Sequence, residues 1–236
     1  MRTEDLEVRE RLGRVHEEIR AAAGRAGRDT SEITVVAVSK EVPIERILEA
    51  FEAGQRRFGE NRVQELLGKI EQPGAEGMLW HFVGRLQRNK VRSVLEKVEL
   101  IHSLDRIELA EEIDRRADAP VEVLVEVNTS GEPTKAGVPP GELRALLRRV
   151  IRRENISVRG LMTMAPVVSA PEATRPFFRM LADLRDRAAS EFPDSGIHHL
   201  SMGMSQDYAV AVEEGATILR IGEAIFGSRH LTGERH

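Results

Sequence analysis

Apolar and polar residues follow two different periods along this chain. Residues 4–26 repeat their apolar positions every three or four residues, as one face of a helix does, and Gly27 follows where a helix commonly ends. Beyond Gly27, short β-branched runs alternate with longer amphipathic stretches. The short runs, which predict strands, are residues 34–38, 57–59, 80–83, 100–102, 121–127, 158–162, 197–200 and 217–220.

Helical periodicity separates each predicted strand from the next. Strands alternating with helices indicate βαβ units and a parallel sheet. Eight such units after one helix predict an α/β fold, a single (β/α)8 barrel of TIM type with an extra N-terminal helix over residues 1–27, rather than an open doubly wound sheet. We expect one domain over residues 1–236. The predicted helices are residues 44–53, 63–70, 89–98, 106–117, 141–153, 172–190, 206–213 and 224–228.

Nucleotide-binding motifs are missing from the positions where they would be expected. No Gly-x-Gly-x-x-Gly follows the first predicted strand, and no Gly-x-x-x-x-Gly-Lys-[Ser/Thr] occurs in the sequence. Dinucleotide-binding and P-loop functions therefore lose their main support. Residues 131–140 form a long predicted loop after the fifth strand, which in a barrel would lie over the active-site face.

Composition excludes several classes of function. Hydrophobic residues make up 41% of the chain, and 35 basic residues nearly balance 39 acidic ones, for a net charge of -4. This balance predicts neither a nucleic-acid partner nor a membrane-binding face. The absence of cysteine excludes disulfides and thiolate chemistry and fits a reducing compartment. We find no signal peptide and no stretch of ~20 apolar residues, so we expect a cytoplasmic protein.

The first predicted strand ends beside a lysine, Lys40. In parallel α/β folds the chemistry gathers at the C-terminal ends of the strands. An ammonium group that lies against apolar side chains loses hydration, and this lowers the pKa of the amine. A neutral amine is a nucleophile that can form a Schiff base. The alternative is a lysine that simply extends from the strand end into water.

Polar side chains also follow the other predicted strands, whose C-terminal ends would meet at one rim of a barrel. The segments Ser201-Met202-Gly203-Met204-Ser205 and Ile221-Gly222 join the last two strands to helices, and this is where barrels commonly bind phosphate. The alternative is that Ser205 is an ordinary helix cap and Gly222 a tight turn. The polar residues at the other strand ends are Glu60, Asn61, Arg85, His102, Glu126, Asn128, Thr163, Arg220 and Glu223.

Histidines in this sequence do not predict a metal site. His81 lies inside an apolar run, where a core or hydrogen-bonded histidine is also expected. No histidine or carboxylate stands at a spacing typical of metal ligands, and the His198-His199 pair fits a strand end. We therefore expect no metal.

These motifs together resemble the pyridoxal phosphate homeostasis proteins, a family with an alanine-racemase-like barrel. The resemblance runs in order from about residue 34 to the end of the chain. Its most specific parts are the Trp80-to-Lys90 block and the Ser-Met-Gly-Met-Ser segment. The remaining matched segments are residues 37–40, 58–61, 64–65, 127–128, 135–137, 160–164, 220–222 and 225–227.

The resemblance implies that Lys40 holds pyridoxal 5'-phosphate (PLP) as an internal aldimine and that the protein acts in intracellular PLP homeostasis as a carrier or buffer. Asn61 would lie beside the cofactor ring, and the serines of the Ser-Met-Gly-Met-Ser segment would bind the phosphate together with Gly222. PLP is the implied ligand and PLP-dependent apoenzymes are further candidate partners, with no nucleic acid, membrane or metal. The expected cofactor-binding residues are Lys40, Asn61, His81, Met162, Ser201, Met202, Ser205, Arg220 and Gly222.

By the same resemblance, Arg220 would face the pyridine nitrogen. A guanidinium only donates hydrogen bonds, so it leaves this nitrogen unprotonated and the ring a poor electron sink. Racemisation also needs a second acid/base, which alanine racemases take from a C-terminal domain of a partner subunit. Few residues follow Gly227, and Tyr208, the single tyrosine, is expected to pack against the barrel wall. We therefore expect no dedicated catalytic activity.

Three other functions remain open from the sequence. One is a PLP-dependent racemase or another amino-acid enzyme. Another is a Schiff-base aldolase in which Lys40 attacks a sugar phosphate directly. The third is a binding protein for a different phosphorylated ligand, with Lys40 paired to the phosphate.

Overall fold

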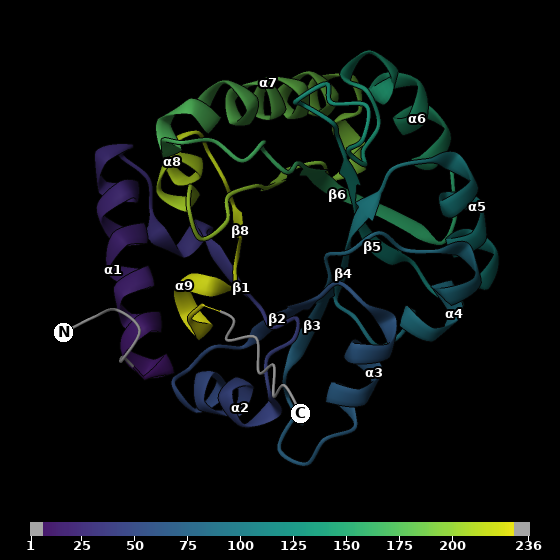
Figure 1. The fold of residues 1–236 in the computed structure, drawn as a ribbon. Coiled ribbons are helices and arrows are strands. Elements are labelled where there is room, and N and C mark those ends of the chain that lie inside the picture. The colour runs from purple at the N-terminus through teal and green to yellow at the C-terminus, as the bar shows by residue number, and fades with distance from the viewer. Residues whose placement is uncertain (1–6, 229–236) are drawn as a thin grey trace.

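Eight parallel strands close into a barrel in the computed structural model, which describes residues 7–228 (Figure 1). Each strand pairs with its neighbours in sequence, and β1 pairs with β8 from Thr34 opposite Ile218 to Ala37 opposite Ile221. This closure confirms the predicted barrel. The strands are β1 (Thr34–Val38), β2 (Arg57–Glu60), β3 (Leu79–Phe82), β4 (Leu100–Leu104), β5 (Val121–Glu126), β6 (Ile156–Met162), β7 (His199–Ser201) and β8 (Ile218–Ile221).

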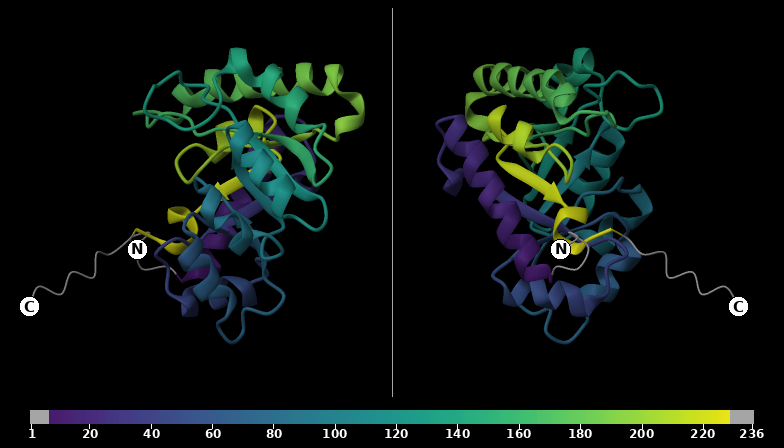
Figure 2. Two further views of the ribbon diagram at one scale, coloured as in Figure 1. Left: turned by 90° about the vertical axis from the view of Figure 1, so that its right-hand side faces the viewer. Right: turned by 60° about the vertical axis from the view of Figure 1, so that its left-hand side comes forward.

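Helices surround the barrel on the outside (Figures 1 and 2). The longer ones bury one apolar stripe, as α6 does with Leu143, Leu146, Leu147 and Val150 at positions i, i+3, i+4 and i+7. The helices are α1 (Val8–Arg25), α2 (Ile44–Glu52), α3 (Val63–Ile70), α4 (Val91–Val94), α5 (Ile107–Arg116), α6 (Leu143–Val150), α7 (Arg175–Glu191), α8 (Tyr208–Glu213) and α9 (Glu223–Phe226), with 3-10 turns at η2 (Thr30–Glu32), η3 (Arg88–Lys90), η4 (Pro140–Glu142), η5 (Pro171–Thr174) and η6 (Pro193–Ser195).

One predicted helix is wrong over most of its length, and several others start or end two or three residues from their predicted bounds. The stretch predicted at 89–98 contains only η3 and the four-residue α4, because Leu95 is extended (φ -56°, ψ 141°) and Glu96 has φ 67°. The predicted N-terminal helix over 4–26 is α1, and its first three residues lie outside the described residues. The predicted domain limits at residues 1 and 236 also lie outside them, so these limits stay a prediction.

The barrel interior combines a small apolar layer with buried polar groups. Its apolar layer is separate from the larger core between the barrel and the helices, because strand side chains alternate between the two faces. The buried polar groups are the side chains of His81, His102, Ser201 and Arg220. The apolar layer consists of Val36, Leu100, Leu124, Met162 and Ile218.

The N-terminal helix α1 packs beside α8 and α9, the last helices in the described residues (Figures 1 and 2). Arg28, just after α1, donates to the carbonyl oxygens of Val212 and Ala216 at 2.7 and 2.8 Å. The hydroxyl of Tyr208 donates to the carboxylate of Glu18 on α1. Tyr208 thus packs against the outside of the barrel and does not line the cavity described below.

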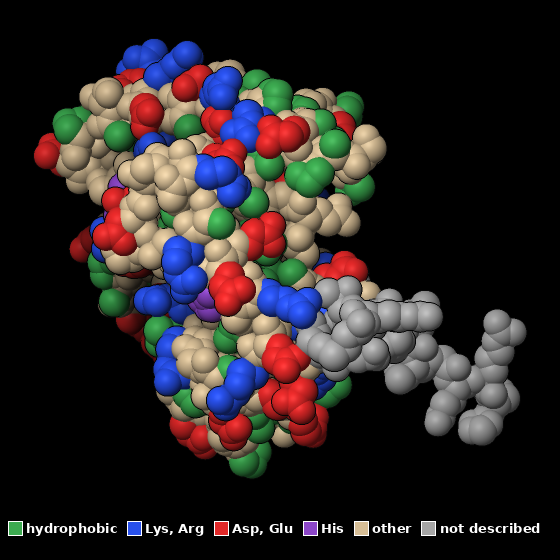
Figure 3. Space-filling view, turned by 90° about the vertical axis from the view of Figure 1, so that its left-hand side faces the viewer, with side chains coloured by type: hydrophobic (Ala, Val, Ile, Leu, Met, Phe, Trp, Pro, Cys, Tyr) green, Lys and Arg blue, Asp and Glu red, His purple; other side chains and the backbone are tan. Residues whose placement is uncertain are grey.

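Surface charges of both signs are interspersed on the face shown in Figure 3. Within residues 7–228, no helix is long and apolar enough to cross a membrane.

Candidate functional site

A cavity of about 920 Å³ opens at the C-terminal ends of the strands. This volume suits a small organic ligand. Lys40 and Asn61 line it after the first two strands, and Ser205, Arg220 and Gly222 line it from the last two. Residues 164–169, which follow β6, form another part of its wall. The cavity therefore gathers five of the nine residues predicted to bind the cofactor.

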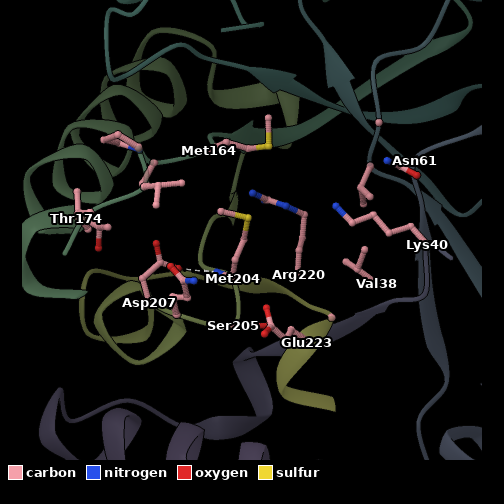
Figure 4. Close-up of a pocket in the computed structure, with 18 of the residues that line it drawn as sticks. Val38, Lys40, Asn61, Met164, Thr174, Met204, Ser205, Asp207, Arg220 and Glu223 are labelled. Atoms are coloured by element: carbon pink, nitrogen blue, oxygen red, sulfur yellow. Dashed lines mark hydrogen bonds between the residues drawn. The ribbon is translucent and has the colours of Figure 1, made fainter. Parts of the chain in front are cut away.

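Lys40 extends from the end of β1 into this cavity, where its amine lies near the side chain of Arg220 (Figure 4). Lys40 is half-buried. In the described part of the chain its amine has no hydrogen-bond or ion-pair partner. An amine without a carboxylate partner is free to react with a ligand, so this placement favours the nucleophile over a surface lysine.

A buried ion pair between Lys69 and Glu60 contacts the turn that carries Lys40. Lys69 of α3 donates to the Ser39 carbonyl and to Glu60 Oε1, both at 2.6 Å. The Ser39 hydroxyl also donates to Glu60 Oε1, at 2.7 Å. Burial raises the pKa of Glu60 to about 7, although Lys69 and Ser39 act in the opposite direction. These contacts fix the backbone of Ser39 and so position the neighbouring Lys40.

Asn61 follows β2 and is held close to the loop after β3. A Cβ atom on Gly84 would lie 2.2 Å from the Asn61 carbonyl oxygen, so only glycine permits this approach. The buried Oδ1 atom of Asn61 has no hydrogen-bond partner within residues 7–228. A buried acceptor without a partner is costly, which favours a donor on the bound ligand.

Arg220 lies at the floor of the cavity and is buried. Its Nη1 donates to Ser201 Oγ at 2.5 Å, and its Nη2 donates to the Thr163 carbonyl at 2.8 Å. Burial lowers the pKa of Arg220 to about 10, with Glu126 and Asp207 acting in the opposite direction. The guanidinium therefore stays charged near neutral pH and presents only donors to the cavity.

The loop after β7 is tied to the start of α9. Ser205 Oγ accepts from the backbone N–H of Ala224 at 3.1 Å, and Asp207 Oδ1 accepts from the Met204 N–H at 2.7 Å (Figure 4). Gly222 passes the end of β1 so closely that a Cβ atom there would lie 3.0 Å from the Val38 carbonyl oxygen. The two predicted phosphate-binding segments are thus adjacent.

Four predicted cofactor-binding residues do not line the cavity. Met162 belongs to the apolar layer inside the barrel, and Met202 packs outward into the core beneath the helices. Ser201 points into the barrel below the cavity, where its hydroxyl contacts Arg220 and His102. His81 lies deeper still and contacts His102 and Glu99. A direct phosphate contact by Ser201 therefore does not fit its position, since the side chain sits below the rim.

Several parts of the cavity wall were not predicted as site residues, and two of them bear on its chemistry and shape. Glu126, the last residue of β5, lines the cavity and is buried. Its position at a strand end was the available signal. The loop at 164–169 brings Met164 and Val167, and its sequence carried no chemical signal.

The residues present fit PLP. An unpaired amine can react with the aldehyde, a charged donor is available for the pyridine nitrogen, and Asn61 offers a free acceptor. No group of three or more metal-ligating side chains comes together in the part of the chain that the structure describes.

Comparisons with known proteins point to the same ligand chemistry. A pyridoxal phosphate homeostasis protein of Aquifex aeolicus is 49% identical over 223 residues, which cover 93% of this chain and 97% of that protein. The Escherichia coli K12 protein of the same name is 40% identical over 233 residues, covering 94% and 97%. PipY of Synechococcus elongatus PCC7942, solved with PLP bound, has a TM-score of 0.83 and 35% identity, covering 94% of this chain and 100% of PipY.

More distant similarity concerns the fold alone. An alanine racemase of Clostridium difficile 630 has a TM-score of 0.69 at 14% identity, covering 96% of this chain and 57% of the racemase. Residues 11–230 match the family model of the alanine racemase N-terminal domain. The chain belongs to the pyridoxal phosphate homeostasis protein family, built on the alanine racemase N-terminal-domain barrel.

Proposed function

We propose that this protein binds PLP reversibly through Lys40 and acts in PLP homeostasis as a carrier or buffer of the cofactor. The observation that carries the proposal is the unpaired Lys40 amine in a cavity that also holds Arg220. The PLP bound to PipY, a protein of the same fold over 94% of this chain, supports it.

The side chains of the site suit holding and release. Lys40 would hold the cofactor through its amine, which can condense with the aldehyde with loss of one water molecule and be freed again by addition of water. Arg220 would offer a donor to the pyridine nitrogen, and a guanidinium that only donates would leave this nitrogen unprotonated and the ring a weak electron sink. Ser205 and the backbone beside Gly222 are the groups available for the phosphate. We infer a function in storage and delivery, with PLP-dependent apoenzymes as the recipients.

The test is to locate the covalent bond. Borohydride reduction of the PLP-loaded protein, followed by peptide mass spectrometry, is expected to find one pyridoxyl group on Lys40. Lys40→Ala is expected to lose the yellow absorbance while its unfolding midpoint stays within a few degrees of the wild type. Lys90 is also half-buried but does not line this cavity, so Lys90→Ala is the control and should remain yellow. A pyridoxyl group on a different lysine, such as Lys135, would overturn the assignment of Lys40.

An amino-acid enzyme on the same site is the second candidate, favoured by Glu126, a carboxyl group that lines the cavity and could move a proton. Exchange of the Cα hydrogen of amino acids in D₂O measures this activity. We expect no exchange beyond one equivalent per protein. Rapid exchange over many turnovers would replace the carrier function with an enzymatic one.

A further inference from the structure

A continuous chain of hydrogen bonds runs through the interior of the barrel from one rim to the other. At the rim opposite the cavity, Glu99 pairs with Arg57 through two bonds of 2.9 Å. Glu99 Oε2 also lies 3.1 Å from His81 Nε2, and His81 Nδ1 lies 2.9 Å from His102 Nε2. His102 Nδ1 lies 2.9 Å from Ser201 Oγ, which contacts Arg220. The cavity-facing guanidinium is thus linked to the far rim.

The direction of each hydrogen bond in this chain follows from its two ends. Arg220 can only donate, so Ser201 Oγ accepts from it and its own hydrogen is free for His102 Nδ1. His102 then carries its hydrogen on Nε2 and donates to His81 Nδ1. His81 in turn carries its hydrogen on Nε2 and donates to the Glu99 carboxylate. When both histidines are neutral, each hydrogen that points along this series, from Arg220 through Ser201, His102 and His81, therefore has one acceptor.

The surroundings favour the neutral form of both rings. His81 and His102 are 2% and 0% exposed, and burial lowers the pKa of each. Arg220 and His199 also lower the pKa of His102. Arg57 lowers that of His81, whereas Glu99 and Glu122 raise it. A charged His102 would donate to Ser201, which already accepts from Arg220, and would leave the serine hydrogen without an acceptor.

We propose that His102 and His81 are positioning residues, which orient the Ser201 hydroxyl as the acceptor that holds Arg220 against the pyridine nitrogen of PLP. This inference rests on the proposed function. The series does not conduct a proton from the site, because Arg220 has no lone pair with which to accept one. The hydrogen-bonded series instead holds the Arg220 guanidinium in one orientation. In this way His81 and Ser201 act on the site although neither lines the cavity.

The hydrogen-bond directions can be tested without cofactor. Nitrogen-15 NMR of the full chain free of PLP is expected to show His81 and His102 neutral, with hydrogen on Nε2, from about pH 6 to 8. Ser201→Ala should change the Nδ1 signal of His102, while Ser103→Ala should leave it unchanged. Ser103 is a matched control because its buried hydroxyl on the same strand as His102 has no partner in the described residues. A hydrogen on His102 Nδ1 would overturn the inference.

The effect on the site is tested with PLP. Ser201→Ala and His102→Phe are expected to weaken PLP binding about tenfold and to shift the pH midpoint of the bound-cofactor absorbance, because Arg220 loses its oriented acceptor. His102→Gln, whose amide can accept and donate at once, should restore part of the binding and spectrum. Ser103→Ala should stay within about twofold of wild type.

The possible results separate the two proposals. Wild-type protein that takes up no PLP overturns the proposed function, and with it the role of the histidines, whatever the NMR shows. Wild-type protein that binds PLP while Ser201→Ala and His102→Phe both match Ser103→Ala overturns the positioning role alone. If His102→Phe does not fold, the comparison of Ser201→Ala with Ser103→Ala decides the positioning role.

Discussion

At the scale of single residues, Glu126 has an unusual environment for a carboxyl group. It is 3% exposed and lines the cavity beside Arg220. Burial raises its pKa to about 7, Asp105 adds to this increase, and Arg220 and Arg85 oppose it. The folded protein therefore binds a proton on Glu126 more tightly than the unfolded chain does, and folding takes up a proton between about pH 4.5 and 7.

This raised pKa predicts a pH-dependent stability. The contribution of Glu126 is favourable below about pH 4.5 and is lost as the pH rises to about 7, because the buried carboxylate must then be charged. Glu126→Gln removes this dependence and is expected to raise the unfolding free energy by about 1–3 kcal/mol at pH 8 and by little at pH 4. Urea unfolding at both pH values measures the difference. An equal change at the two pH values would contradict the raised pKa.

At the scale of elements, the loops after β2 and β3 are shaped by a close backbone contact. A Cβ atom on Gly84 would meet three backbone atoms of Asn61 at 2.2–2.7 Å, and backbone atoms cannot move aside as a flexible side chain does. This contact positions Asn61 in the cavity wall. Gly68 in α3, by contrast, has nothing within 4 Å of an added Cβ.

Replacing these two glycines by alanine should have opposite effects. Gly84→Ala is expected to lower the unfolding free energy by about 1–3 kcal/mol and to weaken PLP binding, because the Asn61 backbone must shift. Gly68→Ala is expected to raise stability by about 0.5–1 kcal/mol, since alanine suits a helix interior better than glycine. Denaturant unfolding and PLP titration measure both effects. Equal stability of the two variants would show that the Gly84 contact relaxes freely.

At the scale of the whole molecule, α1 packs against α8 and α9, which lie near the other end of the described residues. Val8, Leu12, Val15 and Ile19 are buried along one face of α1, which packs beside α8 and α9. Arg28 then donates to the carbonyl oxygens of Val212, in the last turn of α8, and of Ala216, just beyond this helix. The helix therefore packs against the outside of the barrel, beside the helices that flank its last strand.

Loss of the Arg28 contacts should weaken the whole barrel. Arg28→Ala leaves two carbonyl oxygens without their charged donor and is expected to lower the unfolding free energy by about 1–3 kcal/mol in a single transition. Arg14→Ala, at an exposed position on α1, is the control and should change it by less than about 0.5 kcal/mol. Hydrogen exchange should show α1 opening together with β1 and β8. Early opening of α1 alone would contradict this view.

The sequence by itself determined most of the elements, their order and the position of Lys40 at the end of the first strand. Helix and strand periods are local properties, and consecutive βα units place each strand beside the previous one, so eight units predict a closed barrel. Lys40 could be assigned to the rim because it directly follows a strand. The short α4 could not be predicted, since its end at Leu95 depends on where the chain must turn toward β4.

Only the tertiary structure decided which strand residues reach the cavity. Successive strand residues point to opposite faces, and the stagger of the strands sets the depth of each inward side chain. Ser201 lies opposite Ile218, so it faces Arg220 from below instead of reaching the rim, while Met202 points outward into the helix core. The contact between His81 and His102 joins the neighbouring strands β3 and β4 inside the barrel, at a depth that no local pattern encodes.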